Sequence, residues 1–208
     1  MKTTPLIASL LLVTGLGVSL GFAPQNTPGA TTAAPQPTTT HSYEIDSVHS
    51  TALFRVHHLG AGRFYGRFNT LDGTIEHTPG SERGLAFDVT IPIESVDTNN
   101  ASLDGHLKSP DFFNAREFEA MTFKSTSARR TAEDRYDVTG DLSIHGVTKT
   151  ITVPVELTGS ADLGRGRRGG FETHFTIKRS EYGMTYGVSN GMLGDETLII
   201  VSMEGKAK

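Results

Sequence analysis

Apolar and polar side chains alternate along most of the chain between residues 43 and 208, and this pattern constrains the fold more than any other feature. In the clearest run, Leu85, Phe87, Val89 and Ile91 are each separated by one residue. A period of two residues places successive side chains on opposite faces of a β-strand, with one face buried and the other wetter. Similar runs, which together predict an all-β fold, lie near 52–58, 63–68, 120–126, 136–144, 149–158, 171–179 and 196–204.

Turn motifs separate these runs. They are Asp72-Gly73, Pro79-Gly80, Glu133-Asp134, His145-Gly146 and a long glycine-rich loop from Gly159 to Gly170. About eight short strands at this spacing are typical of an antiparallel barrel or a sandwich, and a closed barrel leaves no exposed strand edge. Pro92 and Pro154 fall inside strand-like runs, so we expect them at strand ends, bulges or edges.

One segment, residues 99–119, does not alternate, and we expect a short helical insert near 103–118 over one end of the barrel. Ser109 is a good residue to cap a helix, and Pro110 fits the first helical position. Phe112 and Phe113 would then turn apolar surface toward the barrel, as part of the core or as a lid.

The first 42 residues are not expected to belong to the barrel. Lys2 precedes the uncharged stretch 6–22, which predicts that residues 1–23 form a signal peptide or a retained N-terminal anchor. Residues 24–42 are rich in Pro, Thr and Ala, as in a disordered linker, so the barrel domain would span 43–208. We expect a periplasmic or secreted protein, with a membrane tether through 6–22 as the alternative to cleavage.

Charge and cysteine content exclude several functions. The formal net charge is −4, which argues against nucleic acid as a partner, because phosphates require a basic surface. The chain has no cysteine, so it has no disulfide, no thiolate nucleophile and no thiolate zinc ligand.

Titratable residues do not form a recognisable catalytic or metal site. His57 and His58 are neighbours on a strand and point to opposite faces, so they cannot chelate one ion together, and we expect no metal. Asp104, His106 and Arg179 could serve an enzyme, with Ser180 or Ser109 as a nucleophile, but the chain has no Gly-x-Ser-x-Gly elbow. We therefore predict no catalytic residues. Arg179 itself is expected either to pair with a carboxylate or to meet an anionic or carbonyl headgroup of a ligand.

Six strings, in order, resemble the YceI-like polyisoprenoid-binding family, which is lipocalin-like in architecture. They are YEIDSVHSTALFRVHHLG (43–60), FYGRFNTLDGTI (64–75), IESVDTNN (93–100), DGHLKSPDFFNAREFEAMTFKST (104–126), VTGDLSIHGVTKTITVPVEL (138–157) and IKRSEYGM (177–184). The chain departs from the family pattern at Tyr43, Leu103, Glu119 and Thr150, where tryptophan, arginine, proline and proline are usual. The missing arginine at 103 weakens any charged headgroup cluster there.

This resemblance implies an antiparallel barrel of about eight strands around an elongated apolar cavity. Members resemble carriers of isoprenoid chains, including polyprenyl pyrophosphates and quinone tails, or of other long lipids. Many are exported, some form homodimers, and none has agreed catalytic residues or a required cofactor. The expected function is storage or transport of such a lipid, and the alternatives are a lipid-modifying enzyme and a cavity-free, stress-related interaction module. The residues expected to bind the lipid are Phe54, Val56, Phe68, Phe87, Val89, Phe112, Phe113, Phe123, Ile144, Ile177, Arg179, Tyr182 and Met184.

Overall fold

A computed structural model describes residues 39–162 and 164–208. The expected signal or anchor and nearly all of the expected linker lie outside these residues. Within the described part, no helix is long and apolar enough to cross a membrane. The elements are β1 (His41–Ile45), η1 (Ser47–His49), β2 (Thr51–His58), β3 (Gly62–Phe68), β4 (Asp72–His77), β5 (Leu85–Pro92), η2 (Ile93–Ser95), β6 (Val96–Asp97), α1 (Ala101–Leu107), β7 (Ala120–Ala132), β8 (Arg135–Ile144), β9 (Val147–Asp162), β10 (Arg167–Lys178), η3 (Arg179–Tyr182) and β11 (Leu193–Ala207).

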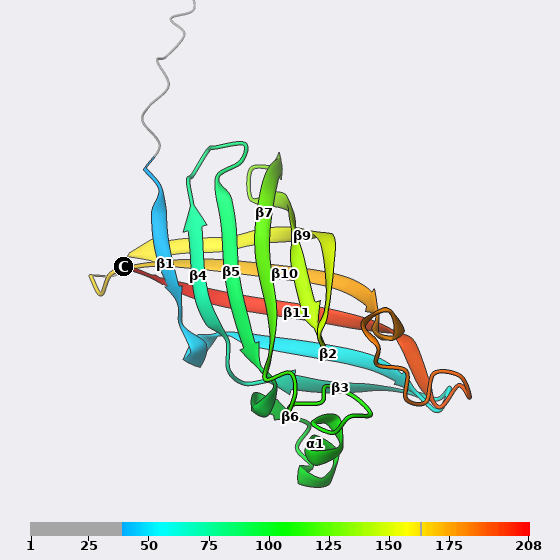
Figure 1. Cartoon of the computed structure of the whole chain (residues 1–208). Helices are drawn as coiled ribbons and strands as arrows, with labels where there is room; N and C mark the ends of the chain where they lie inside the picture. The colour runs from blue at the N-terminus through cyan, green and yellow to red at the C-terminus, as the bar shows by residue number, and fades with distance from the viewer. Residues whose placement is uncertain (1–38, 163) are drawn as a thin grey trace, which may run out of the picture. The chain divides into compact units, whose positions relative to one another are not determined.

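Eight antiparallel strands close into a barrel in the order β1-β4-β5-β7-β8-β9-β10-β11, and β11 pairs back with β1 (Figure 1). Along the edge that faces away from β10, the long strand β11 pairs with two strands: residues 205–207 pair with β1, and residues 193–202 pair with β2. The single-turn helix η1 connects β1 to β2, the two strands that share β11. The Asp46 side chain caps this helix by accepting from the Val48 N–H at 3.1 Å. Strands β2, β3 and β6 extend the sheet beyond β11. The predicted antiparallel barrel is confirmed.

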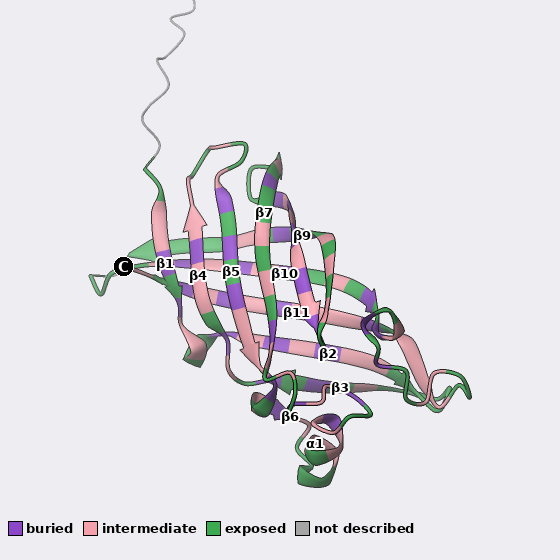
Figure 2. Ribbon diagram, in the orientation of Figure 1, coloured by how far each residue is buried: buried purple, intermediate pink, exposed green. Residues whose placement is uncertain are grey.

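Alternating burial explains why these sequences form strands. Along β8 every second residue is buried, from Tyr136 through Val138, Gly140 and Leu142 to Ile144. Strand β5 shows the same pattern, and Figure 2 displays it as alternating buried and exposed segments on the ribbon. The inward side chains meet in one apolar cluster, which is the hydrophobic core of the barrel.

Three of the five predicted turn segments are confirmed, and two are part of strands instead. Pro79-Gly80, Glu133-Asp134 and His145-Gly146 form turns. Asp72-Gly73 instead begins β4, where Gly73 has φ +137° and pairs with Val89. The segment expected as a long loop from 159 to 170 is largely strand, because β9 and β10 remain paired as far as Asp162 and Arg167.

Both prolines occupy sites where a missing N–H does no harm to the sheet. Pro92 is the last residue of β5. Pro154 pairs with Asp137 of β8. On its other side it has no partner, because the pairing of β9 with β10 begins only at the next residue, Val155. The expected placement of Pro92 and Pro154 at strand ends or edges is confirmed.

The helical insert lies over one end of the barrel (Figure 1), but its helix begins earlier than expected. Helix α1 spans Ala101–Leu107, and the Asn100 side chain caps it by accepting from the N–H groups of Ser102 and Leu103, both at 3.1 Å. The predicted start at Ser109 was wrong. The chain turns there, and the Phe113 N–H donates to the Leu107 carbonyl at 3.0 Å, so the segment after α1 folds back on it.

Candidate functional site

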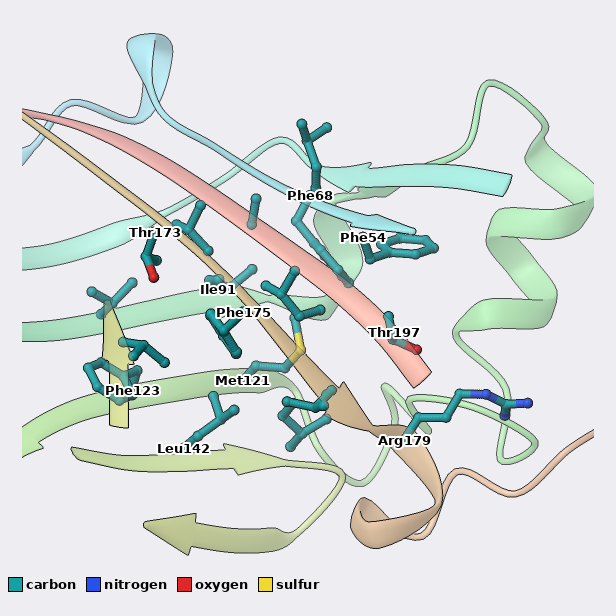
Figure 3. Close-up of a pocket in the computed structure, with 18 of the residues that line it drawn as sticks. Phe54, Phe68, Ile91, Met121, Phe123, Leu142, Thr173, Phe175, Arg179 and Thr197 are labelled. Atoms are coloured by element: carbon teal, nitrogen blue, oxygen red, sulfur yellow. The ribbon is translucent and has the colours of Figure 1, made fainter. Parts of the chain in front are cut away.

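The barrel encloses an apolar cavity of about 150 Å³. Its walls come from β2, β3, β5, β7, β8, β9, β10 and β11, and the insert after β6 adds Leu107, Phe112 and Phe113. Phenylalanines from opposite walls, among them Phe54, Phe123 and Phe175, point into it (Figure 3). A cavity with such walls suits an apolar guest.

Twelve of the thirteen residues expected at the site line this cavity: Phe54, Val56, Phe68, Phe87, Val89, Phe112, Phe113, Phe123, Ile144, Ile177, Arg179 and Met184. Tyr182 is not among the lining residues. It lies in η3 with 1% of its surface exposed, and the ammonium of Lys149 stands 5.7 Å from its ring centre. Burial raises the pKa of Tyr182.

Sixteen further residues complete the lining, and period-two alternation could have found most of them. Four of these, which alternate along β11, are Thr197, Ile199, Val201 and Met203. The others are Ala52, Leu53, Ile91, Leu107, Met121, Thr122, Leu142, Val153, Val155, Thr173, Phe175 and Leu193. Strands β9 and β11 therefore contribute wall residues that a selection of mainly aromatic positions misses.

The insert contributes aromatic rings to the wall of the cavity. Phe112 packs against His106 and Tyr186, with ring centres 4.9 and 5.2 Å apart. Phe113 contacts Phe68 edge-on at 5.4 Å. Phe112 belongs to the hydrophobic core and Phe113 packs against that core, so both rings form part of the packed wall of the cavity.

Arg179 is the one charged side chain among the described lining residues, and only 5% of it is exposed. Its guanidinium donates to backbone carbonyls of the segment that follows η3: Nε to Gly194 at 2.9 Å, Nη1 to Met184 at 2.9 Å, and Nη2 to Tyr186 at 2.7 Å and Leu193 at 3.5 Å. Neither expected partner, a carboxylate or a headgroup, accounts for these bonds. Arg179 instead holds the 184–194 segment against the end of the barrel.

The carboxylate of Asp195 acts on this arginine through its charge, without an ion pair between the two side chains. The Ser180 N–H and Oγ donate to its two carboxylate oxygens at 2.9 and 2.8 Å. Burial raises the pKa of Asp195, but the bonds from Ser180 and the charge of Arg179 outweigh it, and the pKa lies below its usual value. Burial lowers the pKa of Arg179, and Asp195 opposes that effect.

The residues considered for an enzyme each have another structural partner. Asp104 accepts from the Thr98 N–H at 2.8 Å and from the Thr98 hydroxyl at 2.6 Å. His106 Nε2 lies 3.0 Å from an Asp111 oxygen. Among the described residues no hydrogen bond joins Asp104, His106 and Arg179, so the structure does not assemble them into a catalytic group.

One carboxylate and imidazole cluster outside the cavity has a cation of its own. Asp46, His49 and Glu204 lie close enough together to share an ion. The Arg168 guanidinium lies between two of them, with Nη1 2.6 Å from Asp46 and 3.0 Å from Glu204. Bonds from Arg168 and His49 lower the pKa of Asp46 to about 2. An internal ion pair therefore occupies this cluster.

Comparison with known proteins places this barrel in a family. The YceI-like domain model matches residues 43–205. Protein YceI of Salmonella arizonae is 38% identical over 166 residues, which are 78% of this chain and 85% of that protein. The crystal structure of the Campylobacter jejuni YCEI protein is 31% identical, with a TM-score of 0.67 over 73% of this chain and 90% of that one.

A polyisoprenoid binding domain from Saccharophagus degradans, implicated in plant cell wall breakdown, has the same fold. Its TM-score is 0.62 at 16% identity, over 81% of this chain and 99% of that domain. The match to the family model over most of the chain, together with the identity to protein YceI, settles the relationship: the chain belongs to the YceI-like family.

Proposed function

We propose that the protein binds one long apolar lipid, of the isoprenoid class or similar, in the barrel cavity and stores or transports it. The observation that carries the proposal is the composition of the cavity wall. Of its 28 described lining residues only Thr122, Thr173, Arg179 and Thr197 are polar. The polyisoprenoid binding domain with the same fold, named above, adds support by analogy.

Hydrophobic transfer gives such a wall its affinity. Each methylene group removed from water contributes about 0.8 kcal/mol, so a long hydrocarbon chain needs no specific polar contact to bind. The cavity volume of about 150 Å³ resembles that of cavities that hold a molecule the size of benzene. A longer chain therefore requires lining side chains to change rotamer, and Met121 and Met203 are suited to this because methionine side chains are flexible.

We infer binding and not catalysis as the role of the cavity. Among the described lining residues no carboxylate, histidine or lysine faces the space, and the Arg179 guanidinium is bonded to backbone carbonyls. A general acid or base must lie within hydrogen-bond reach of the reacting group. The existence of an enclosed apolar space also speaks against the interaction module without a cavity.

Export is part of the proposal and rests on the sequence. Lys2 and the uncharged stretch 6–22 are typical of a secretory signal or anchor, which would place the barrel in the periplasm or outside the cell. Cell fractionation and N-terminal sequencing of the mature protein would separate a cleaved signal from a membrane tether. Native mass spectra would show a homodimer as a doubled mass.

A cavity-filling variant tests the function. Ala52 lines the cavity with 3% of its surface exposed, so Ala52→Phe places a ring in the space that a lipid would occupy. Thr176→Phe adds a ring of the same kind on the exposed outer face of β10. We expect the wild type and Thr176→Phe to take up a fluorescent polyprenyl lipid from vesicles, and Ala52→Phe to lose most of this uptake while keeping its far-UV circular dichroism. Equal uptake by all three would contradict the cavity as the binding site.

A further inference from the structure

Two hydroxyl groups in the cavity wall have no hydrogen-bond partner. Thr173 on β10 and Thr197 on β11 are each 8% exposed, and their Oγ1 atoms are two of the three buried side-chain polar atoms without a partner among the described residues. Both residues line the cavity (Figure 3). Buried polar groups are almost always bonded, and valine has nearly the same shape. The unpaired hydroxyls therefore point to a partner that a ligand would supply.

The register of the strands separates the two hydroxyls along the cavity. Thr197 pairs with Ile177, two residues before Arg179, whereas Thr173 pairs with Val201. These two positions are four residues apart along β11, which corresponds to about 13 Å. Val56 and Leu193 line the cavity on the Thr197 side and are only partly buried, whereas beyond Thr173 the rings of Phe171 and Tyr43 pack against each other with 2% and 1% of their surface exposed. Thr197 thus lies toward the end of the cavity that approaches solvent, and Thr173 lies deeper.

Arg179, although close to Thr197, has little capacity left for a ligand. A guanidinium has five N–H groups, and four bonds to the carbonyls of Met184, Tyr186, Leu193 and Gly194 leave one Nη1 hydrogen. No other cationic side chain is among the described lining residues. A pyrophosphate drawn into the cavity as far as Thr197 would lose its hydration without the paired, bidentate contacts that offset this loss.

We propose that the end of the cavity beside Thr197 is a subsite for an uncharged lipid headgroup that carries an oxygen acceptor, such as a ketone, quinone, ester or amide carbonyl. The Thr197 hydroxyl donates a hydrogen bond to that oxygen, and the hydrocarbon tail extends past Thr173 toward the closed part of the barrel. The inference rests on the proposed carrier function and narrows its ligand from any isoprenoid lipid to one with a neutral, acceptor-bearing head.

Three probes with one tail test the subsite: a geranylgeranyl ketone, the hydrocarbon of the same length and geranylgeranyl pyrophosphate. Their dissociation constants are measured with the full chain as wild type, Thr197→Val, Thr197→Ser and Thr173→Val. Valine keeps the shape and removes the hydroxyl, serine keeps the hydroxyl, and Thr173→Val removes a hydroxyl that cannot reach the same headgroup. Thermal unfolding of each variant confirms that it folds.

The wild type should bind the ketone more tightly than either other probe. Thr197→Val should weaken ketone binding about fivefold and leave hydrocarbon binding unchanged. Thr197→Ser, which keeps the hydroxyl, and Thr173→Val should both bind the ketone like the wild type. Tighter binding of the pyrophosphate, or unchanged ketone binding in Thr197→Val, would overturn the subsite and leave the carrier function standing. If none of the probes binds the wild type, the carrier function fails and the subsite with it.

Discussion

The ring of Phe54 on β2 lies across Gly66, its direct partner on β3, and a methyl group added at Gly66 would stand 2.2 Å from Phe54 Cζ. The glycine therefore sets the position of a phenylalanine that lines the cavity. Phe123 has a similar relationship with Gly140 of β8, where an added methyl would lie 2.6 Å from its Cζ. Glycines on neighbouring strands thus leave room for the aromatic side chains of the cavity wall.

Gly66→Ala should force the Phe54 ring out of its place. Overpacking of this kind costs about 1–3 kcal/mol of unfolding free energy, and urea unfolding would measure it. Gly62→Ala is the matched control on the same strand, since nothing lies within 4 Å of a methyl group added there. Equal unfolding free energies for the two variants would contradict the contact.

The Asp46–Arg168 ion pair predicts a loss of stability in acid. The pKa of Asp46 in the fold is about 2, below its ordinary value of 3.8, so the folded state binds this proton less readily than the unfolded state. The stabilisation is complete above about pH 5 and is lost as the pH falls through 4 toward 2. Thermal unfolding across this range should show a smaller acid-induced fall for Asp46→Asn than for the wild type.

Asp72→Asn is a suitable control for that series, because Asp72 forms no ion pair with another described residue. Its unfolding temperature should follow the wild-type curve. An Asp46→Asn curve that runs parallel to the wild type down to pH 2 would show that the ion pair contributes nothing to acid stability.

Arg179→Lys should loosen the segment 184–194 while keeping the positive charge. Lysine cannot direct donors to the carbonyls of Met184, Tyr186 and Gly194 at once, and the buried Met184 carbonyl, if left unpaired, would cost about 1–3 kcal/mol. Hydrogen–deuterium exchange should therefore rise in this segment. Lys178→Arg, the reverse exchange at the exposed neighbouring position, should leave exchange unchanged, and equal protection in both variants would contradict the role of Arg179.

The strands and most of the cavity wall could be predicted because both follow from one local rule. Alternation along Leu85, Phe87 and Val89 specifies which side chains share a face, and closure of the barrel turns that face inward. Strand β11 shows the same rule at Thr197 and Val201. Most of the wall could therefore be predicted from period two, without regard to whether a residue is aromatic, but Leu53 and Thr122 break the alternation.

What the sequence did not reveal depends on contacts between distant segments. Asn100 and Ser109 are both good helix-capping residues. The helix begins after Asn100 because the chain beyond Leu107 folds back on α1, and the sequence does not show that contact. Arg179 bonds to carbonyls up to 15 residues away, which no pattern of side chains indicates. Tyr182 follows the last residue of β10 by four positions, in η3, so the alternation of the strand no longer determines which way it faces.

The central claim is that the barrel cavity holds a lipid, and native mass spectrometry of the full chain, purified without detergent and followed by solvent extraction, tests it most directly. We predict a population heavier than the bare chain by the mass of one lipid, which is lost on extraction and restored by an added polyprenyl ketone. A spectrum that shows only the bare chain, before and after addition of polyprenyl lipids, would contradict the claim.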